Sequence, residues 1–430
     1  MVALVDTAVV RLWGQTVGAV AWDRNRRVGT FEYEPTFLRS GLEISPLRMP
    51  LSHGRRRHRF VRLPEQTFHG LPGLLADSLP DRFGNQIIDA WLARQGRAPH
   101  DFSPVERLCY MGARGMGALE YSPSLLKNMQ RSVPVELARL VTLAADVIEN
   151  RQDLRANLQA PTEALLDIMR VGTSAGGARP KAVIAIHPDT GEVRSGQVLA
   201  PEGFEYWLIK FDGVSCASLG DPAGFGRIEL AYHTMAVTAG LHMMPCQLLE
   251  EGGRAHFMTR RFDRGPTGQK KHLQSLCALG HHDFNDPGAT SYEQAFGVAR
   301  QLAVPQTDID DLYRRMVFNV LARNQDDHTK NIAFLMDRSG TWRLSPAYDV
   351  CYSYNPAGRW TSTHQMSIAG KRDNFTLNDL IQTGEQHDVL RPERSIKRVA
   401  DAVAQWSDHA KRAGVTTDQL ASIARTHRTL

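Results

Sequence analysis

Apolar residues recur at helical spacing between residues 308 and 321, so this segment is predicted to form a helix with one buried face. Aspartates occupy its first turn, where the helix dipole favours negative charge. A polar run follows at 323–331, and an apolar strand is predicted at 332–336. Residues 337–340 read as a hairpin turn, and a second strand is predicted at 341–344. The pattern therefore predicts a helix that delivers a polar loop, followed by a hairpin.

The earlier part of the chain shows mainly strand patterns. Alternation between residues 7 and 34 predicts a meander of three strands. Residues 71–95 are expected to be helical, with Pro80 interrupting them, and 134–149 has one apolar helical face. A second short helix is expected at 160–170. The sequence thus predicts a mixed β/α part that a linker helix follows.

The remaining segments divide into a strand-rich and a helical part. Residues 182–258 alternate strands with one helix, whereas most segments from 292 to 430 have helical spacing. We therefore predict an accessory domain at 1–130, a smaller strand-rich lobe at 131–258 and a helical lobe at 259–430.

Composition indicates a soluble globular protein. Of 430 residues, 42% are hydrophobic and 23% charged, and no apolar run is long enough to span a bilayer. The N-terminus lacks the layout of a signal peptide, and five scattered cysteines indicate neither a disulfide scaffold nor a zinc site. Reducing cytoplasm is the expected compartment. The net charge of +5 permits nucleic-acid contact without indicating it, and the basic run at 54–59 is either a phosphate-binding patch or a solvated loop.

The polar loop carries candidate chemistry for phosphoryl transfer. Protein kinases separate the proton-accepting aspartate from a metal-binding asparagine as D-x-x-x-x-N, and a second metal-binding aspartate follows a short hairpin. Asp326 and Asn331 have this spacing, and Asp349 follows the predicted hairpin. Asp326 is therefore the candidate base, and Asn331 and Asp349 are candidate magnesium ligands. The alternative is a solvated acidic turn with a capping aspartate.

A kinase also needs a cradle for phosphate, and small residues between 171 and 181 are suited to one, because their backbone N–H groups can face an anion. An ordinary Gly-Gly turn before Pro180 is the alternative. Lys210 then ends an apolar strand, and Glu229 follows in a helical segment, in the order of the kinase lysine and its glutamate partner. Loop, lysine, glutamate, base, asparagine and aspartate thus occur in kinase order.

The chain resembles the HipA toxin kinases of bacterial toxin–antitoxin modules over nearly its whole length. The resemblance is carried by S-A-G-G-A-R-P-K at 174–181, R-F-D-R at 261–264, N-Q-D-D-H-T-K-N at 324–331 and P-A-Y-D at 346–349. It implies an α+β fold of two protein-kinase-like lobes, with a β-rich N-terminal accessory domain and a mostly helical C-terminal lobe.

The resemblance also implies roles for single residues. Asp326 would accept the proton, Asn331 and Asp349 would hold Mg²⁺, and Lys210 would contact ATP phosphates and pair with Glu229. Spacing assigns Asp327 to ordering the loop, because only Asp326 stands five positions before Asn331. The other residues expected around ATP are Ala175, Gly176, Gly177, Ala178, Arg179, Pro180, Lys181, Arg260, Arg261, Phe262, His328, Lys330 and Tyr348.

In the family, the serine that matches Ser174 is autophosphorylated, and the modified loop leaves the nucleotide site. A phosphoserine adds about −1.5 to −2 charges, which would repel a triphosphate. Transfer between molecules is expected, because a residue of the cradle does not easily reach its own γ-phosphate. Thr173 is an alternative acceptor.

The implied function is an ATP-dependent serine/threonine kinase toxin that phosphorylates a translation component, possible targets being aminoacyl-tRNA synthetases. Its partner would be a HipB-like helix-turn-helix antitoxin, through which the kinase would approach DNA indirectly. Two alternatives stay open. One is a catalytically weak module that binds a repressor or DNA, and the other is a metal phosphoesterase using Asp326, Asp327 and His328.

Overall fold

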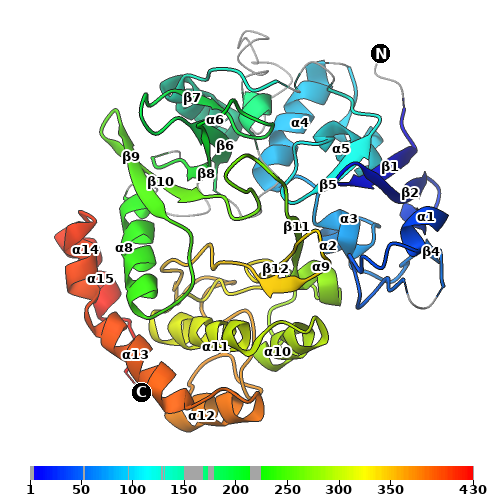
Figure 1. The fold of residues 1–430 in the computed structure, drawn as a ribbon. Helices are drawn as coiled ribbons and strands as arrows, with labels where there is room; N and C mark the ends of the chain where they lie inside the picture. The colour runs from blue at the N-terminus through cyan, green and yellow to red at the C-terminus, as the bar shows by residue number, and fades with distance from the viewer. Residues whose placement is uncertain are drawn as a thin grey trace. The chain divides into compact units, whose positions relative to one another are not determined.

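The computed structural model describes residues 4–51, 54–94, 96–126, 129, 131–149, 168–172, 179–213 and 224–429 (Figure 1). The chain forms two compact units. Unit 1 contains residues 1–44, 49–223 and 249–273, and unit 2 contains residues 45–48, 224–248 and 274–430.

Unit 1 begins with a five-stranded antiparallel sheet in the order β4-β3-β2-β1-β5. Its strands are β1 (Thr7–Leu12), β2 (Gln15–Asp23), β3 (Val28–Tyr33), β4 (Arg57–His58) and β5 (Leu119–Ser122). Ala8, Val10 and Leu12 alternate into the core, as the two-residue period of a half-buried strand requires. The predicted meander is confirmed.

Helices follow this meander. They are α1 (Pro35–Leu38), α2 (Glu65–Phe68), α3 (Gly73–Ala76), α4 (Arg82–Arg94), a 3₁₀ turn at Pro99–Asp101, α5 (Pro104–Met111) and α6 (Leu137–Glu149). Ser103 and Glu106 form a capping box that fixes the start of α5. Pro80 stands just before α4, and α6 confirms the predicted linker helix. The short helix expected at 160–170 lies almost wholly outside the described residues.

The second sheet has the order β7-β6-β8-β10-β9. Its strands are β6 (Lys181–Ile186), β7 (Val193–Ser195), β8 (Glu205–Lys210), β9 (Cys246–Glu251) and β10 (Arg254–Arg260). Its buried residues Ile184, Ile209 and Met258 belong to one hydrophobic cluster with Ile87 of α4 and Leu140 of α6. Residues 182–258 therefore form the expected strand-rich segment, most of it within unit 1.

A buried charged cluster joins the segment after β10 to the loop before β5, both in unit 1. Asp263 accepts hydrogen bonds from Arg261, Arg264 and the backbone of Gly117. Arg264 also donates to the carbonyls of Gly115 and Gly117, and Lys270 binds Ala113 O and Glu120. The accessory part and the second sheet are thus joined by paired charges as well as by apolar contact.

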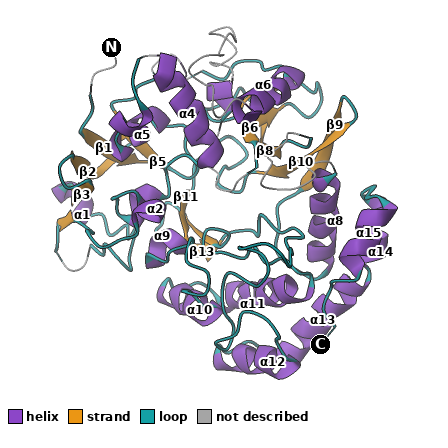
Figure 2. Ribbon diagram, turned by 180° about the vertical axis from the view of Figure 1, so that it is seen from behind, coloured by secondary structure: helices purple, strands orange, loops and turns teal. Residues whose placement is uncertain are grey.

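Unit 2 is mostly helical, as expected (Figure 2). Helices α8 (Phe225–Thr238) and α11 (Gln306–Leu321) both pack on α13 (Pro392–Ala404), and α14 (Trp406–Arg412) packs on α8. The other elements are α9 (Leu276–Gly280), α10 (Tyr292–Gln301), β12 (Ala333–Met336), β13 (Trp342–Leu344), α12 (Leu377–Gln386) and α15 (Thr417–Ala424). The residues of β11 (His272–Ser275) are divided between unit 1 and unit 2. The predicted helix–loop–hairpin corresponds to α11, β12 and β13 and is confirmed.

The two compact units do not correspond one to one to the three predicted parts: α8 belongs to unit 2, and residues 259–273 belong to unit 1. The division into three domains therefore stays a prediction. Across the described ranges, no helix has the length and apolar character needed to cross a membrane.

The basic run at 54–59 lies at an edge of the first sheet. Arg56 and Arg57 form ion pairs with Glu32 at 3.0 and 2.6 Å, and Arg59 lies 3.5 Å from Asp23. Because acidic neighbours on the same sheet offset these charges, the structure favours a solvated sheet edge over a phosphate-binding patch.

Candidate active site

Helix α11 anchors the polar loop of unit 2. Its inner side chains, including Ile309, Leu312 and Met316, have no exposed surface. Asp308 in its first turn accepts hydrogen bonds from Arg343 and from the backbone N–H of Leu344. The helix start is therefore attached to β13, and its end delivers the loop at a fixed place.

The two adjacent aspartates of this loop have opposite environments. The Asp326 side chain is 50% exposed. The Asp327 carboxylate is buried and accepts hydrogen bonds from His364 Nδ1 at 2.8 Å, Gln365 N at 2.8 Å and the Tyr292 hydroxyl at 3.0 Å. An exposed carboxylate can receive a proton from an approaching hydroxyl, whereas a carboxylate whose lone pairs are already engaged cannot. This contrast supports the expected division of roles.

The charge state of Asp327 follows from these contacts. Burial alone would raise the pKa of Asp327, but the His364 contact and the other donated hydrogen bonds outweigh it and hold the pKa below its ordinary value. Burial and the nearby carboxylate raise the pKa of Tyr292 well above its usual range, so this phenol stays protonated and donates. Asp327 is therefore an ionised anchor of the loop.

Asn331 and His328 of this loop lie beside Asp326. Asn331 Nδ2 donates to the Asp326 carbonyl at 2.8 Å, which leaves Oδ1 as the amide atom that can face a cation. His328 Nε2 lies 4.0 Å from Asp326 Oδ1. Lys330 Nζ lies 4.6 Å from the Phe284 ring centre, and the Tyr348 hydroxyl donates to Lys330 O at 2.6 Å. Unit 2 thus brings five of the predicted site residues together in the polar loop and the adjoining segment: Asp326, His328, Lys330, Asn331 and Tyr348.

Asp349 has a left-handed backbone conformation, with φ of 52°. A non-glycine residue in this region is uncommon, and aspartate tolerates it better than most. Asp349 and Asn331 line one small cavity of about 20 Å³, together with Asp327 and Arg315. The structure therefore brings the two predicted metal ligands to a common place.

These residues fit a magnesium ion that is shared with a nucleotide. Asn331 and Asp349 offer amide and carboxylate oxygens, which are the donors that Mg²⁺ prefers. Within the described residues, no group of three His, Cys, Asp or Glu side chains could hold a metal ion by itself. Mg²⁺ commonly takes one or two protein ligands and completes its shell with water and phosphate oxygens, so the two-ligand set is adequate.

The absence of a three-residue metal site among the described residues argues against the alternative function, a metal phosphoesterase that would use Asp326, Asp327 and His328. Such an enzyme needs several protein ligands around each metal ion. The Asp327 oxygens are already engaged by three donors, so this carboxylate is unsuited to bind metal.

The predicted residues of unit 1 are only partly described. Thr173, Ser174, Ala175, Gly176, Gly177 and Ala178 lie outside the described residues. Lys210 pairs in register with Lys181 and Phe257 on the adjacent strands, and its Nζ lies 5.6 Å from the Phe257 ring centre. Lys210 and Glu229 belong to different units, so their ion pair stays a prediction.

Lys181 is expected around ATP, where it would neutralise phosphate, and the alternative is a merely exposed lysine before a strand; the structure shows a buried side chain. Its side chain is 2% exposed, and its Nζ lies 4.0 Å from Asp81 Oδ2. Asp81 thus competes with any phosphate for this ammonium group. The roles of Arg179 and Pro180 stay predictions.

The family resemblance implies that Arg260, Arg261 and Phe262 lie near the adenine of ATP, and the two arginine side chains are engaged within unit 1. Arg261 donates to Asp263 and to Gly196 O, and its side chain is 1% exposed. Arg260 lies 3.1 Å from Glu205. The Arg261 guanidinium therefore has a structural role, and adenine contact by Arg260, Arg261 and Phe262 stays a prediction for their backbone groups and the Phe262 ring.

Sequence reasoning missed several residues that hold the loop. Tyr292, His364 and Arg428 all belong to the network around Asp327. Arg315 binds Asp311 and Ser345 O, and its Nη1 has no hydrogen-bond partner within the described part of the chain. No local motif marks Tyr292, His364 or Arg428, because their partners in this network are distant in sequence.

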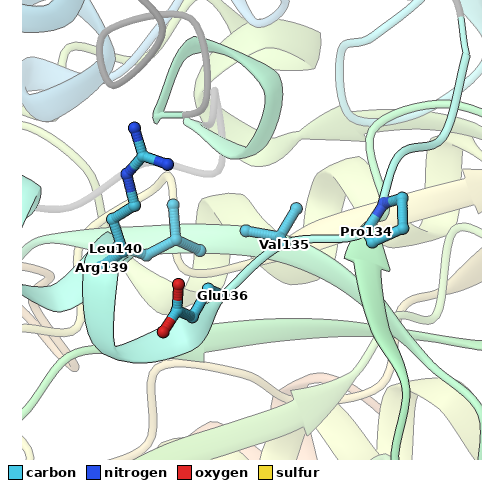
Figure 3. A pocket seen from close by; sticks show the side chains of 5 residues that line it. All are labelled: Pro134, Val135, Glu136, Arg139 and Leu140. Atoms are coloured by element: carbon cyan, nitrogen blue, oxygen red, sulfur yellow. The ribbon is translucent and has the colours of Figure 1, made fainter. Parts of the chain in front are cut away.

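A larger hollow occurs in unit 1 at the start of α6. It has a volume of about 480 Å³ and is lined by Pro134, Val135, Glu136, Arg139 and Leu140 (Figure 3). The Arg139 guanidinium and the Glu136 carboxylate point away from each other there. None of the described residues that line it is a predicted site residue, and among these no convergent polar groups mark the hollow as a binding site.

Comparisons with known proteins show which family the chain resembles. The family models of the HipA N-terminal domain and the HipA-like C-terminal domain match residues 8–122 and 173–412. The protein Y4mE of Sinorhizobium fredii, provisionally named a kinase, is 24% identical over 359 residues, which is 80% of this chain and 76% of that protein. A solved structure of the Shewanella oneidensis toxin–antitoxin complex of HipA, HipB and operator DNA is similar in fold, with a TM-score of 0.64. It is 15% identical and covers 97% of this chain and 94% of that chain.

Proposed function

The chain belongs to the HipA family, and from this premise we propose that it is an ATP-dependent serine/threonine protein kinase that acts as the toxin of a toxin–antitoxin module. One observation carries the proposal most strongly. A half-exposed Asp326 stands beside a fully engaged Asp327, and Asn331 is bonded to the Asp326 carbonyl while it shares a cavity with Asp349.

In the proposed reaction, Asp326 accepts the proton of the substrate hydroxyl while the hydroxyl oxygen attacks the γ-phosphorus and ADP leaves. Asn331 Oδ1 and the Asp349 carboxylate would hold the cation. Magnesium bound there would offset the negative charge of the phosphates. Lys210, a residue of unit 1, neutralises the charge of a phosphate. Asp327 fixes the backbone of the loop and exchanges no proton.

The proposed substrate is a protein of the translation apparatus, such as an aminoacyl-tRNA synthetase, and the proposed partner is a small helix-turn-helix antitoxin. The Shewanella structure, which contains HipA, HipB and operator DNA, supports this assignment of partners. The kinase would then approach DNA through its antitoxin. Expression of the chain alone should slow growth, and co-expression of the antitoxin should restore it.

Autophosphorylation at Ser174 is proposed to silence the kinase. Incubation with labelled ATP and Mg²⁺ should label the chain, and Ser174→Ala should remove most of the label while Thr173→Ala retains it. Mixing a Ser174→Ala chain that retains activity with an Asp326→Asn chain should label the latter, because transfer is expected between molecules. Label that stays on Ser174→Ala and disappears from Thr173→Ala would assign the modification to Thr173.

Asp349→Asn is expected to raise the Mg²⁺ concentration that gives half-maximal activity at least tenfold, because the charged ligand of the cation is lost. Losing a group that only supports a metal ligand already changes metal affinity or activity about 10- to 100-fold. The measurement is initial rate against Mg²⁺ concentration at saturating ATP. Asp418→Asn, at an exposed aspartate of the same unit, should leave this concentration unchanged. An unaltered Mg²⁺ dependence in Asp349→Asn would remove Asp349 as a ligand.

A further inference from the structure

Residues 426–428 lie against the start of the polar loop at 323–331, the proposed catalytic loop, within unit 2. The backbone N–H of Arg428 donates to Leu321 O at 2.9 Å, and its Nη1 donates to Val320 O at 3.0 Å. Arg323 Nε donates to Thr426 O at 2.8 Å. These residues follow the segment that matches the C-terminal family model, so that match assigns them no role.

Arg428 also reaches the loop's buried anchor through one histidine. Its Nη1 lies 3.0 Å from His364 Nε2. A guanidinium can only donate, so Nε2 is the acceptor and carries no proton. The ring proton of neutral His364 is therefore on Nδ1, which donates to Asp327 Oδ2 at 2.8 Å. Arg428 thus fixes the tautomer that Asp327 requires.

A second chain of donors reaches Asp327 from the other side. Ser353 Oγ donates to Asn324, Asn324 Nδ2 donates to Asn319 Oδ1, and Asn319 Nδ2 donates to the Tyr292 hydroxyl. Tyr292 in turn donates to Asp327. Both chains run in one direction and end on the same carboxylate, which is adjacent to the candidate base. A hydrogen-bonded network that ends on a buried carboxylate favours a single arrangement of its members.

We propose that Arg428 is a positioning residue of the phosphotransfer reaction, which sets the catalytic loop through His364 and Asp327. The inference rests on the proposed kinase function. Arg428 does not touch the reacting atoms. It acts by holding His364 so that Asp327, and with it the Asp326 backbone, has one position.

The rival explanation is that Arg428 only anchors the last residues of the chain. Its Nη2 pairs with Asp373, and its guanidinium lies 5.3 Å from the Phe375 ring centre, so it has contacts that an anchor would use. If Arg428 is only an anchor, its substitution should lower stability independently of His364. If Arg428 is a positioning residue, its substitution should lower kcat by an amount that depends on His364.

The test is a double-mutant cycle of Arg428→Met and His364→Asn. Asparagine retains a donor for Asp327 and loses the acceptor that Arg428 uses. Each single variant is expected to lower kcat about 10- to 100-fold with little change in the KM for ATP, since small misplacements of catalytic groups have effects of this size. The double variant should be no slower than the slower single variant, because both changes interrupt one connection.

Arg425→Met is the matched control, since Arg425 is an exposed arginine near Arg428, and its kcat should equal that of the wild type. Should Arg428→Met fail to fold, Arg428→Lys replaces it in the cycle, because it keeps the charge and loses the forked donor geometry. Multiplying effects in the double variant, or a folded Arg428 variant with wild-type kcat, would overturn the proposal.

Hydrogen exchange of the peptide that covers residues 320–332 separates this inference from the proposed function. In Arg428→Met and in His364→Asn this peptide should exchange faster than in the wild type, whether or not the chain transfers phosphate. A wild type without phosphotransfer would defeat the kinase function. A normally active chain with unchanged exchange in both variants would defeat the positioning role alone.

Discussion

Asp326→Asn is expected to lower kcat for phosphoryl transfer about a thousandfold, because a positioned general base contributes about 10²- to 10⁴-fold to such reactions. The free energy of unfolding should stay unchanged, since the Asp326 side chain is half exposed and the substitution keeps its shape. Labelled ATP with a protein substrate and a denaturant titration measure the two quantities.

The adjacent carboxylate supplies the matched control. Asp327→Asn should lower the free energy of unfolding by about 2–4 kcal/mol, because an amide N–H₂ would face donors that now bind a buried carboxylate. Of these two neighbouring substitutions, only Asp327→Asn should thus lower the free energy of unfolding. If Asp326→Asn retained more than a tenth of the activity, Asp326 would not be the base.

Asp263→Asn is expected to lower the free energy of unfolding by about 3–5 kcal/mol. Asp263 is fully buried between Arg261 and Arg264, and removing one partner of a buried ion pair leaves uncompensated charge in the interior. The control is Glu205→Gln, which removes a partly exposed pair with Arg260 and should cost less than about 1 kcal/mol.

The same cluster predicts a dependence on pH. Burial acts to raise the pKa of Asp263, but the charges of Arg261 and Arg264 and the donated hydrogen bonds outweigh it and hold the pKa far below its ordinary 3.8. A depressed pKa contributes stability above the unfolded value, and this contribution disappears as pH falls toward the folded value. The difference in unfolding free energy between wild type and Asp263→Asn should therefore shrink below about pH 4. A constant difference down to pH 2.5 would contradict this assignment.

The elements that the sequence predicts well are those with local signals. Helix α11 has a regular apolar face, the hairpin of β12 and β13 has a turn between two apolar runs, and Asp326 and Asn331 stand at a short, recognisable spacing. For these features the residues that determine the structure lie within a few positions of one another.

The supports of the site have no such signal. Asp327 and His364 are separated by 37 positions, and His364 and Arg428 by 64. The family resemblance implies that Arg261 and Lys181 lie around ATP, and in the fold both side chains face buried carboxylates. The sequence around a basic residue does not reveal which distant carboxylate the fold places beside that residue.

The charged cluster of unit 1 limits how the chain can be divided in experiments. A fragment lacking residues 1–130 would lose Glu120 and the carbonyls of Ala113, Gly115 and Gly117, so Arg264 and Lys270 would lose acceptors that they have in the intact chain. Burial already lowers the pKa of Arg264 to about 10 with those acceptors present. An excised kinase portion should therefore be insoluble or misfolded when expressed alone, and its recovery should require the accessory segment supplied on the same chain or as a separate polypeptide.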